Sequence, residues 1–179
     1  TSGLKTCKEE WSENAGIILG SSIGGIETIN YSYKQVFEEG HNRLHPLTIP
    51  KIMNNSATSL ISIEYRIQGP SFTVSSACSS ANHAMGLAYE TIKTRKSNIM
   101  ITGGSESFLS FGGIKPWESL RVLSHDKCRP FSKGRDGLVL GEGAGIFVFE
   151  SLDSAKKRKA EIVAEIIGFS MSSDASDLI

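Results

Sequence analysis

Cys78 lies where a predicted strand, residues 72–76, gives way to a predicted helix that begins with the small residues 79–81. A thiol on such a sharp turn is held clear of the sheet and faces the backbone N–H groups and the positive dipole end of the following helix. Both effects favour the thiolate, which is the nucleophilic form of cysteine. The pattern therefore predicts a nucleophile at Cys78. The alternative is a small buried apolar residue, which is what most free cysteines are.

A catalytic base for Cys78 is not evident among the four histidines. His41, His45 and His125 fall in predicted loops, where solvated histidines are common. His83 follows Cys78 by five residues, so on a helix it lies more than one turn along and on a different side. The residues alone therefore identify neither a proton-handling group nor a full set of oxyanion donors.

The three cysteines, Cys7, Cys78 and Cys128, are far apart and form no CxxC pair. This spacing argues against a disulfide framework and against a structural zinc site. The glycine-rich run 141–145 has the wrong spacing for a dinucleotide-binding loop, and β-type residues follow it where a helix should begin. We therefore expect no metal, no organic cofactor and a reducing compartment.

Net charge and hydropathy limit the classes of partner and the cell compartments to be expected. The 19 basic and 19 acidic residues cancel, so no global field favours nucleic acid or an anionic membrane surface. No apolar stretch approaches the roughly 20 residues of a membrane span, and the first residues do not resemble a secretory signal. We expect a protein of the cytoplasm or of an organelle matrix or stroma.

Strands and helices alternate along the chain, which predicts an α/β layered domain with a mixed or mostly parallel sheet. The helix after Cys78 is rich in small residues and suits the middle of such layers. Strands are expected at residues 15–20, 72–76, 98–102 (ended by Gly103-Gly104), within 138–150 around a glycine bend, and at 162–169. Helices are expected after the glycine-rich turn 20–25 up to Glu38, from Pro50 through Met53, Leu60 and Tyr65, after Cys78, from Trp117 to Val122, and after a capping Ser151.

Residues 75–81, Ser-Ser-Ala-Cys-Ser-Ser-Ala, resemble the active-site cysteine motif of the β-ketoacyl-acyl-carrier-protein synthases, the elongating condensing enzymes of fatty-acid and polyketide synthesis. Further stretches match this family in the same order and cover nearly the whole chain. They are Gly24-Gly25, Gly69-Pro70, Gly103-Gly104-Ser105-Glu106, Arg129-Pro130-Phe131, Arg135-Asp136-Gly137, Gly141-Glu142-Gly143-Ala144-Gly145 and Met171-Ser172-Ser173-Asp174-Ala175.

This resemblance implies a thiolase-like fold, in which two similar halves form an α-β-α-β-α sandwich and usually a homodimer. Residues 1–179 are expected to be a partial N-terminal β-ketoacyl synthase domain that is truncated at both ends. The resemblance also implies that Cys78 accepts an acyl group from a carrier-protein thioester, after which decarboxylated malonyl-carrier protein attacks the acyl-enzyme.

Other roles follow from the resemblance residue by residue. Ile23 matches a position that lines the acyl pocket near the dimer interface, and Trp117 matches a gating aromatic residue. Ordinary core packing is the alternative for both side chains. Arg121 matches a basic residue near the carrier-protein entrance, and Arg43 has a similar expected part, because an acidic carrier helix attracts local positive charge.

The family's two catalytic histidines and its catalytic-site lysine lie in the second half and have no match here. This chain by itself is therefore not expected to decarboxylate malonyl-carrier protein. Two alternatives stay open: a thiolase-type enzyme that uses coenzyme A thioesters, and a non-catalytic piece for dimerisation or carrier binding.

Overall fold

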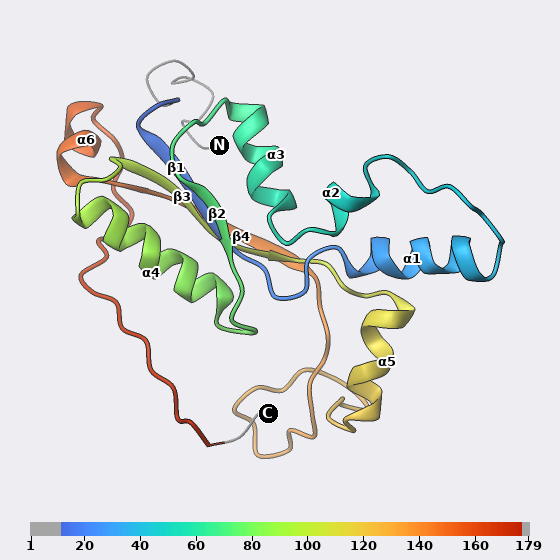
Figure 1. Ribbon diagram of the computed structural model, residues 1–179. Coiled ribbons are helices and arrows are strands. Elements are labelled where there is room, and N and C mark those ends of the chain that lie inside the picture. The colour runs from blue at the N-terminus through green and yellow to red at the C-terminus, as the bar shows by residue number, and fades with distance from the viewer. Residues whose placement is uncertain (1–11, 177–179) are drawn as a thin grey trace.

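The computed structural model describes residues 12–176, and these form a mixed four-stranded sheet in the order β2-β1-β3-β4 (Figure 1). Strand β1 runs parallel to both β2 and β3, whereas β4 runs antiparallel to β3. The predicted α/β layered domain with a mixed sheet is thus confirmed. The strands are β1 Ala15–Gly20, β2 Ser71–Val74, β3 Ile99–Glu106 and β4 Gly143–Glu150.

Helices cover both faces of the sheet, with α4 on one face and α3 on the other (Figure 1). Helices α1 and α5 extend from the edge at which the parallel strands end. Cys7 lies outside the described residues. The helices are α1 Ile26–Phe37, α2 Thr48–Ile52, α3 Ser56–Tyr65, α4 Ser80–Lys93, α5 Phe111–Ser119 and α6 Leu152–Lys157.

The two faces of β1 build two separate cores, because successive side chains of a strand point to opposite faces. Ile17 and Leu19 face α3 and pack with Ala57 and Ile61 of that helix. Ile18 faces α4, together with Ala84 and Ala88. The small residues of α4 thus let the helix lie close to the sheet, as the sequence predicts.

The helical pattern that begins at Pro50 is divided into two helices, so the prediction of one helix is wrong there. Met53 closes α2 with an extended backbone (φ −65°, ψ 137°), and α3 begins only at Ser56. The two helices therefore do not share one buried face. Leu60, expected to face the core, is 64% exposed.

Glycines do not interrupt the sheet where the sequence predicts an end or a bend. Strand β3 continues through Gly103 and Gly104 to Glu106, because the antiparallel partner β4 pairs with it along its whole length. Residues 143–150 form that one partner strand, with Gly143 and Gly145 inside it. Pairing with a neighbouring strand thus outweighs the weak strand preference of glycine.

Residues 162–169 do not form the predicted strand. Within residues 12–176 no strand pairs with this segment, and a strand requires a hydrogen-bonding neighbour. The segment instead lies along α4, where the Tyr89 hydroxyl donates to the Ile167 carbonyl at 3.3 Å. The Phe169 ring occupies the space that a side chain at Gly86 would fill.

Helix α6 begins at the predicted cap. The Ser151 hydroxyl accepts a hydrogen bond from the Ser154 backbone N–H at 3.4 Å, which satisfies one free donor of the first turn. Helices of the part that the structure describes are all too short or too polar to cross a membrane.

Candidate active site

Cys78 lies on the turn between the end of β2 at Val74 and the start of α4 at Ser80. The strand–turn–helix setting predicted from the sequence is therefore confirmed, and the thiol is exposed rather than buried. Ala77, directly before the cysteine, has a left-handed backbone with φ of +50°. A side-chain-bearing residue adopts this conformation at a cost of about 1–2 kcal/mol, so the turn is held there by its surroundings.

Ser80 is the residue that holds this turn. Its buried hydroxyl accepts a hydrogen bond from the Ser76 backbone N–H at 2.9 Å and donates to the Ala77 carbonyl at 2.6 Å. The Ser80 backbone N–H also donates to the Ala77 carbonyl at 3.1 Å. These bonds close the chain on both sides of Cys78 and fix the direction in which the thiol leaves the sheet.

His83 bonds to the same turn. Its ring Nδ1 lies 2.7 Å from the Ser76 hydroxyl, and its ring packs edge-on against Phe169 with centroids 6.3 Å apart. The hydrogen bond of His83 thus goes to Ser76 rather than to Cys78, in keeping with its predicted place on another side of the helix. No sequence pattern identifies this Ser–His pair, because its members belong to different elements.

The turn after β1 lies against the segment that leads to Cys78. The Ser21 backbone N–H donates to the Val74 carbonyl at 3.1 Å, and the Ser75 hydroxyl donates to the Ser22 carbonyl at 3.2 Å. Ile23, half-buried, is the next residue of this turn. The structure therefore brings the predicted acyl-pocket residue Ile23 and the predicted nucleophile Cys78 onto two turns that touch.

Two glycines allow this close approach. A Cβ on Gly20 would overlap the backbone of Ser80 and Ala81, and a Cβ on Gly104 would lie 2.7 Å from the Ala81 Cβ. The start of α4 therefore packs directly on the ends of β1 and β3. The close packing at Gly20 and Gly104 therefore determines how far Cys78 lies from the ends of these strands.

Glu106, the last residue of β3, holds the turn after β1 from its other side. The Ser22 backbone N–H donates to Glu106 Oε2 at 2.6 Å, and the Ser22 hydroxyl also donates to this oxygen. The Ser21 hydroxyl lies 3.4 Å from Oε1. Sequence reasoning includes Glu106 only as part of a matching stretch and misses this contact, which spans 84 positions of the chain.

The other predicted site residues are less closely joined. Trp117 is half-buried on α5, a helix that packs its Gly112 against Asn30 of α1. Arg121 follows α5 with a left-handed backbone (φ +58°), and Arg43 is exposed in the loop between α1 and α2. Within residues 12–176 neither guanidinium group has a hydrogen-bond or ion-pair partner, and nothing brings the two arginines together.

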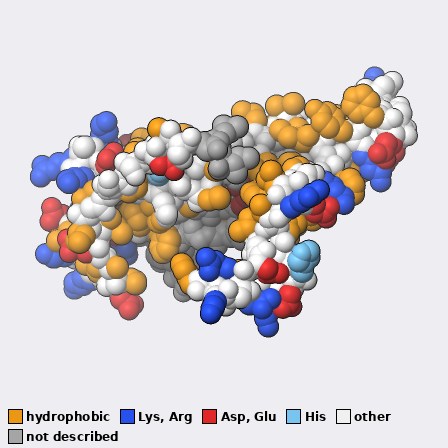
Figure 2. Space-filling view, turned by 90° about the horizontal axis from the view of Figure 1, so that it is seen from below, with side chains coloured by type: hydrophobic (Ala, Val, Ile, Leu, Met, Phe, Trp, Pro, Cys, Tyr) orange, Lys and Arg blue, Asp and Glu red, His pale blue; other side chains and the backbone are white. Residues whose placement is uncertain are grey.

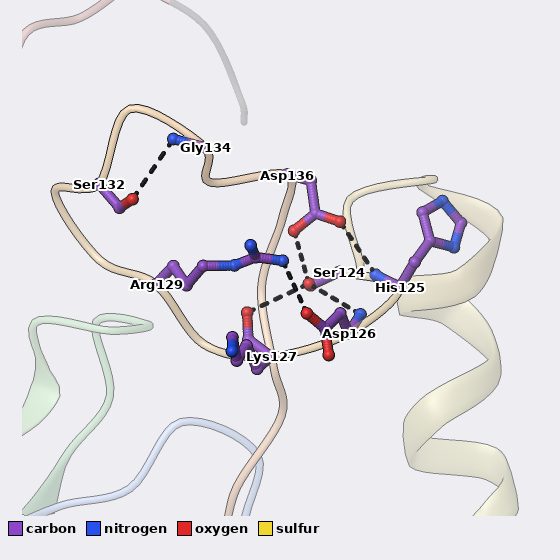
Figure 3. Close-up of polar contacts among 8 residues, drawn as sticks. All are labelled: Ser124, His125, Asp126, Lys127, Arg129, Ser132, Gly134 and Asp136. Carbon is purple, nitrogen blue, oxygen red and sulfur yellow. Dashed lines mark hydrogen bonds and ion pairs between the residues drawn. The ribbon is translucent and has the colours of Figure 1, made fainter.

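The long loop after α5 is closed on itself by polar contacts (Figure 3). The carboxylate of Asp136 accepts from the Ser124 hydroxyl at 2.6 Å and from the His125 backbone N–H at 3.3 Å. Arg129 bonds Asp126 at 3.0 Å. The Asp136 contacts join the start of the loop to its later part, so the matching stretch 135–137 has a structural role in closing this loop.

Two exposed carboxyl groups of this region have lowered pKa values. The Ser124 hydroxyl and then the His125 backbone N–H lower the pKa of Asp136, because both donate to its charged form. The Leu109 backbone N–H and then the Ser107 hydroxyl lower the pKa of Glu142 in the same way. Glu142 thereby joins the chain after β3 to the chain before β4.

We expect Asp136 to titrate below 3.8, its ordinary value. A carboxyl whose pKa is lowered by folding contributes stability above its unfolded pKa, and this contribution is lost as the pH falls through the lower folded value. Carbon-13 NMR of the carboxyl group measures the midpoint. Ser124→Ala removes the largest cause and should move the midpoint upward, so the same midpoint in both proteins would contradict the assignment.

A sequence model of the family described as "Beta-ketoacyl synthase, N-terminal domain" matches residues 2–155. The chain is 41% identical over 174 residues to Nodulation protein E of Rhizobium sp. (strain N33), covering 97% of this chain and 43% of that protein. It is 38% identical over 172 residues to 3-oxoacyl-[acyl-carrier-protein] synthase 2 of Staphylococcus aureus, covering 93% and 43%. The chain thus spans less than half the length of these relatives.

Solved structures show the same similarity in three dimensions. A beta-ketoacyl synthase from Burkholderia phymatum STM815 superposes with a TM-score of 0.83 at 35% identity, covering 94% of this chain and 43% of that one. A ketosynthase solved in complex with a type II polyketide synthase acyl-carrier protein, AntDE:AntF, superposes with a TM-score of 0.75 at 26% identity, covering 84% and 40%. The fold described above is therefore that of the thiolase-like ketosynthases.

Proposed function

Because the chain belongs to the beta-ketoacyl synthase family, we propose that it provides the acyl-accepting part of a 3-oxoacyl-acyl-carrier-protein synthase, with residues 1–179 as a partial N-terminal domain. The observation that carries the proposal is the turn of Cys78. An exposed thiol follows a left-handed Ala77 and precedes α4, on a turn fixed by the buried Ser80 hydroxyl. This geometry suits a nucleophile that must reach a large thioester substrate.

In the proposed reaction the Cys78 sulfur attacks the carbonyl carbon of an acyl thioester. A tetrahedral intermediate forms, its oxyanion is stabilised by N–H donors, and the backbone N–H of Cys78 supplies one of them. The carbon–sulfur bond to the carrier then breaks, and the carrier leaves as a thiolate, which takes up the proton that the Cys78 thiol gave up. The acyl group is left on Cys78, where decarboxylated malonyl-carrier protein attacks it in the complete enzyme, for fatty-acid or polyketide elongation.

The acyl chain is assigned to a pocket lined by Ile23 and Trp117. Ile23 is supported by the contact between its turn and the Cys78 turn, through the 3.2 Å bond from Ser75 to Ser22. Trp117 is supported by its place on α5, which packs against α1 directly after the same turn. Half-burial of both side chains fits a wall that an apolar chain can touch.

The partner assigned to this site is an acyl-carrier protein, loaded with an acyl or a malonyl group. Two relatives support this partner: one is a 3-oxoacyl-[acyl-carrier-protein] synthase, and another is a ketosynthase solved in complex with its acyl-carrier protein. Arg121 and Arg43 are the cationic groups proposed to meet an acidic carrier helix, and both are exposed.

The protein is further proposed to form a homodimer in the cytoplasm or an organelle matrix. Figure 2 shows hydrophobic side chains along the arm at the right, where α1 lies in Figure 1. Tyr31, Tyr33 and Phe37 of α1 are 58%, 62% and 79% exposed, respectively. An apolar surface of this kind is typical of a protein interface.

Mass spectrometry of the protein with two competing donors tests the proposed function. Acyl-carrier protein and acyl-coenzyme A, labelled with different isotopes, are mixed with the protein, and the acylated peptide is identified. The proposal expects the carrier's label on the Cys78 peptide. A label mainly from coenzyme A would favour a thiolase-type enzyme, and carrier binding without any acylation would favour a non-catalytic role.

Arg121→Glu should weaken acyl transfer from the carrier protein about tenfold at low salt, because one attractive charge becomes repulsive. The apparent KM for acyl-carrier protein measures this, and 0.5 M salt should reduce the difference through screening. Lys157→Glu on the distant helix α6 is the matched control. Equal effects of the two changes, or the same loss with a small acyl thioester donor, would contradict docking at Arg121.

A further inference from the structure

Glu106 joins the turn that carries Ile23 to the end of β3, and we propose that it is a positioning residue that sets which acyl chains load onto Cys78. Glu106 acts through this turn and touches no reacting atom. The inference rests on the proposed function, since it concerns the acyl chain that Cys78 accepts.

The register of the sheet explains why a carboxylate reaches this turn. In the parallel pair, Gly20 lies opposite Gly104, so two residues further along Ser22 lies opposite Glu106. The backbone ladder between β1 and β3 ends before this point. The side chain of Glu106 continues it, with the Ser22 N–H at 2.6 Å from Oε2 and the Ser21 hydroxyl at 3.4 Å from Oε1.

The same turn is bonded on its other side to the chain that leads to Cys78. The Ser22 carbonyl accepts from the Ser75 hydroxyl at 3.2 Å, three residues before the cysteine. Ser22 therefore has its N–H and hydroxyl on Glu106 and its carbonyl on Ser75. These contacts set the position of Ile23 relative to Cys78. Glu106 lies outside both the turn after β1 and the turn that carries Cys78, so it holds the first turn from the end of β3.

A carboxylate suits this arrangement because both of its oxygens accept and it carries a charge that strengthens the bonds it accepts. It can take the backbone N–H of Ser22 together with two serine hydroxyls. An amide in its place is neutral: its oxygen can still accept from Ser22 and its NH2 group can donate to the Ser21 hydroxyl, so the exchange removes the charge of the acceptor and one of its accepting oxygens. Since bonds to a charged acceptor are stronger than neutral ones, the exchange should loosen the turn while the strands stay paired.

The test compares wild-type protein with Glu106→Gln, in the protein as its organism makes it. The acceptance of butyryl- and dodecanoyl-carrier protein is measured as the initial rate of Cys78 acylation by mass spectrometry. In the looser turn, Ile23 should obstruct a long acyl chain less than it does in wild type. The ratio of dodecanoyl to butyryl loading should therefore rise about tenfold, which is the fold-change that corresponds to the loss of about one charge-assisted hydrogen bond. Alkylation of Cys78 by iodoacetamide, which needs no acyl pocket, should keep its wild-type rate.

Glu150→Gln is the matched control, because Glu150 is also a hydrogen-bonded carboxylate but lies at the opposite end of the sheet, paired with Ile99. Its chain-length ratio should equal that of wild type. If Glu106→Gln does not fold, Ser22→Ala removes one donor of the same contact and should raise the ratio in the same direction.

The outcomes separate this inference from the proposed function. An unchanged ratio in folded Glu106→Gln, with Cys78 still acylated by the carrier thioester, overturns the role of Glu106 and leaves the function standing. A parallel loss of acylation and of iodoacetamide reactivity makes Glu106 merely structural and also overturns the inference. Failure of wild-type protein to acylate Cys78 overturns the function, and this inference with it.

Discussion

Cys78→Ala should abolish acyl loading from a carrier-protein thioester, lowering its rate by at least about a thousandfold, because the variant has no sulfur to form the new thioester. The loss is expected without unfolding. The thiol is exposed, and the bonds that hold its turn belong to the neighbours Ser76, Ala77 and Ser80. Intact mass before and after incubation measures the loading directly.

Cys128→Ala is the matched control for this experiment. Cys128 is likewise a free and exposed cysteine, but it lies in the long loop after α5 rather than on a strand-to-helix turn. Its variant should load as wild type does. If Cys78→Ala still gains an acyl-sized mass and Cys128→Ala does not, the nucleophile has been assigned to the wrong cysteine.

Gly20→Ala should lower the free energy of unfolding by about 3 kcal/mol and remove acyl loading as well. The added Cβ would overlap the backbone of Ser80 and Ala81, and a backbone cannot turn aside as a long side chain can. Either the start of α4 moves away from β1 or the strand shifts. Both movements displace the start of α4 relative to the sheet, and with it the turn between β2 and α4 that carries Cys78.

Urea denaturation measures the stability change, with Gly145→Ala as the control. Gly145 also lies in a strand, but nothing is within 4 Å of a Cβ placed there. Its variant should change the free energy of unfolding by no more than about 0.5 kcal/mol. Equal stability of the two variants would show that the close contact between β1 and α4 does not constrain the fold.

The parts of the fold that the sequence predicts well are those with local causes. Strand β1 and the start of α4 follow from a short apolar run and from small residues next to Cys78. Ser151 is likewise a local cap, whose partner lies three residues away. In each case, the interactions that form the element are made by residues a few positions apart, so a short stretch of sequence is enough to predict it.

The errors in the sheet and at the site come from contacts between distant residues. Gly103 and Gly104 look like the end of a strand until β4, some forty positions away, is known to pair with them. Residues 162–169 look like a strand but have no strand beside them among the described residues. Glu106 could not be singled out at the site for the same reason, because its partners Ser21 and Ser22 lie 85 and 84 positions earlier in the chain.

The strand order also has a consequence for synthesis on the ribosome. Among the described strands, β1 comes before its two neighbours β2 and β3, so both neighbours emerge later and β3 ends only at Glu106. Such non-local pairing is slow, because long loops must close before the contacts form. The nascent chain therefore carries the Cys78 thiol before it has the sheet that positions this thiol, and during that interval the cysteine is open to oxidants in solution.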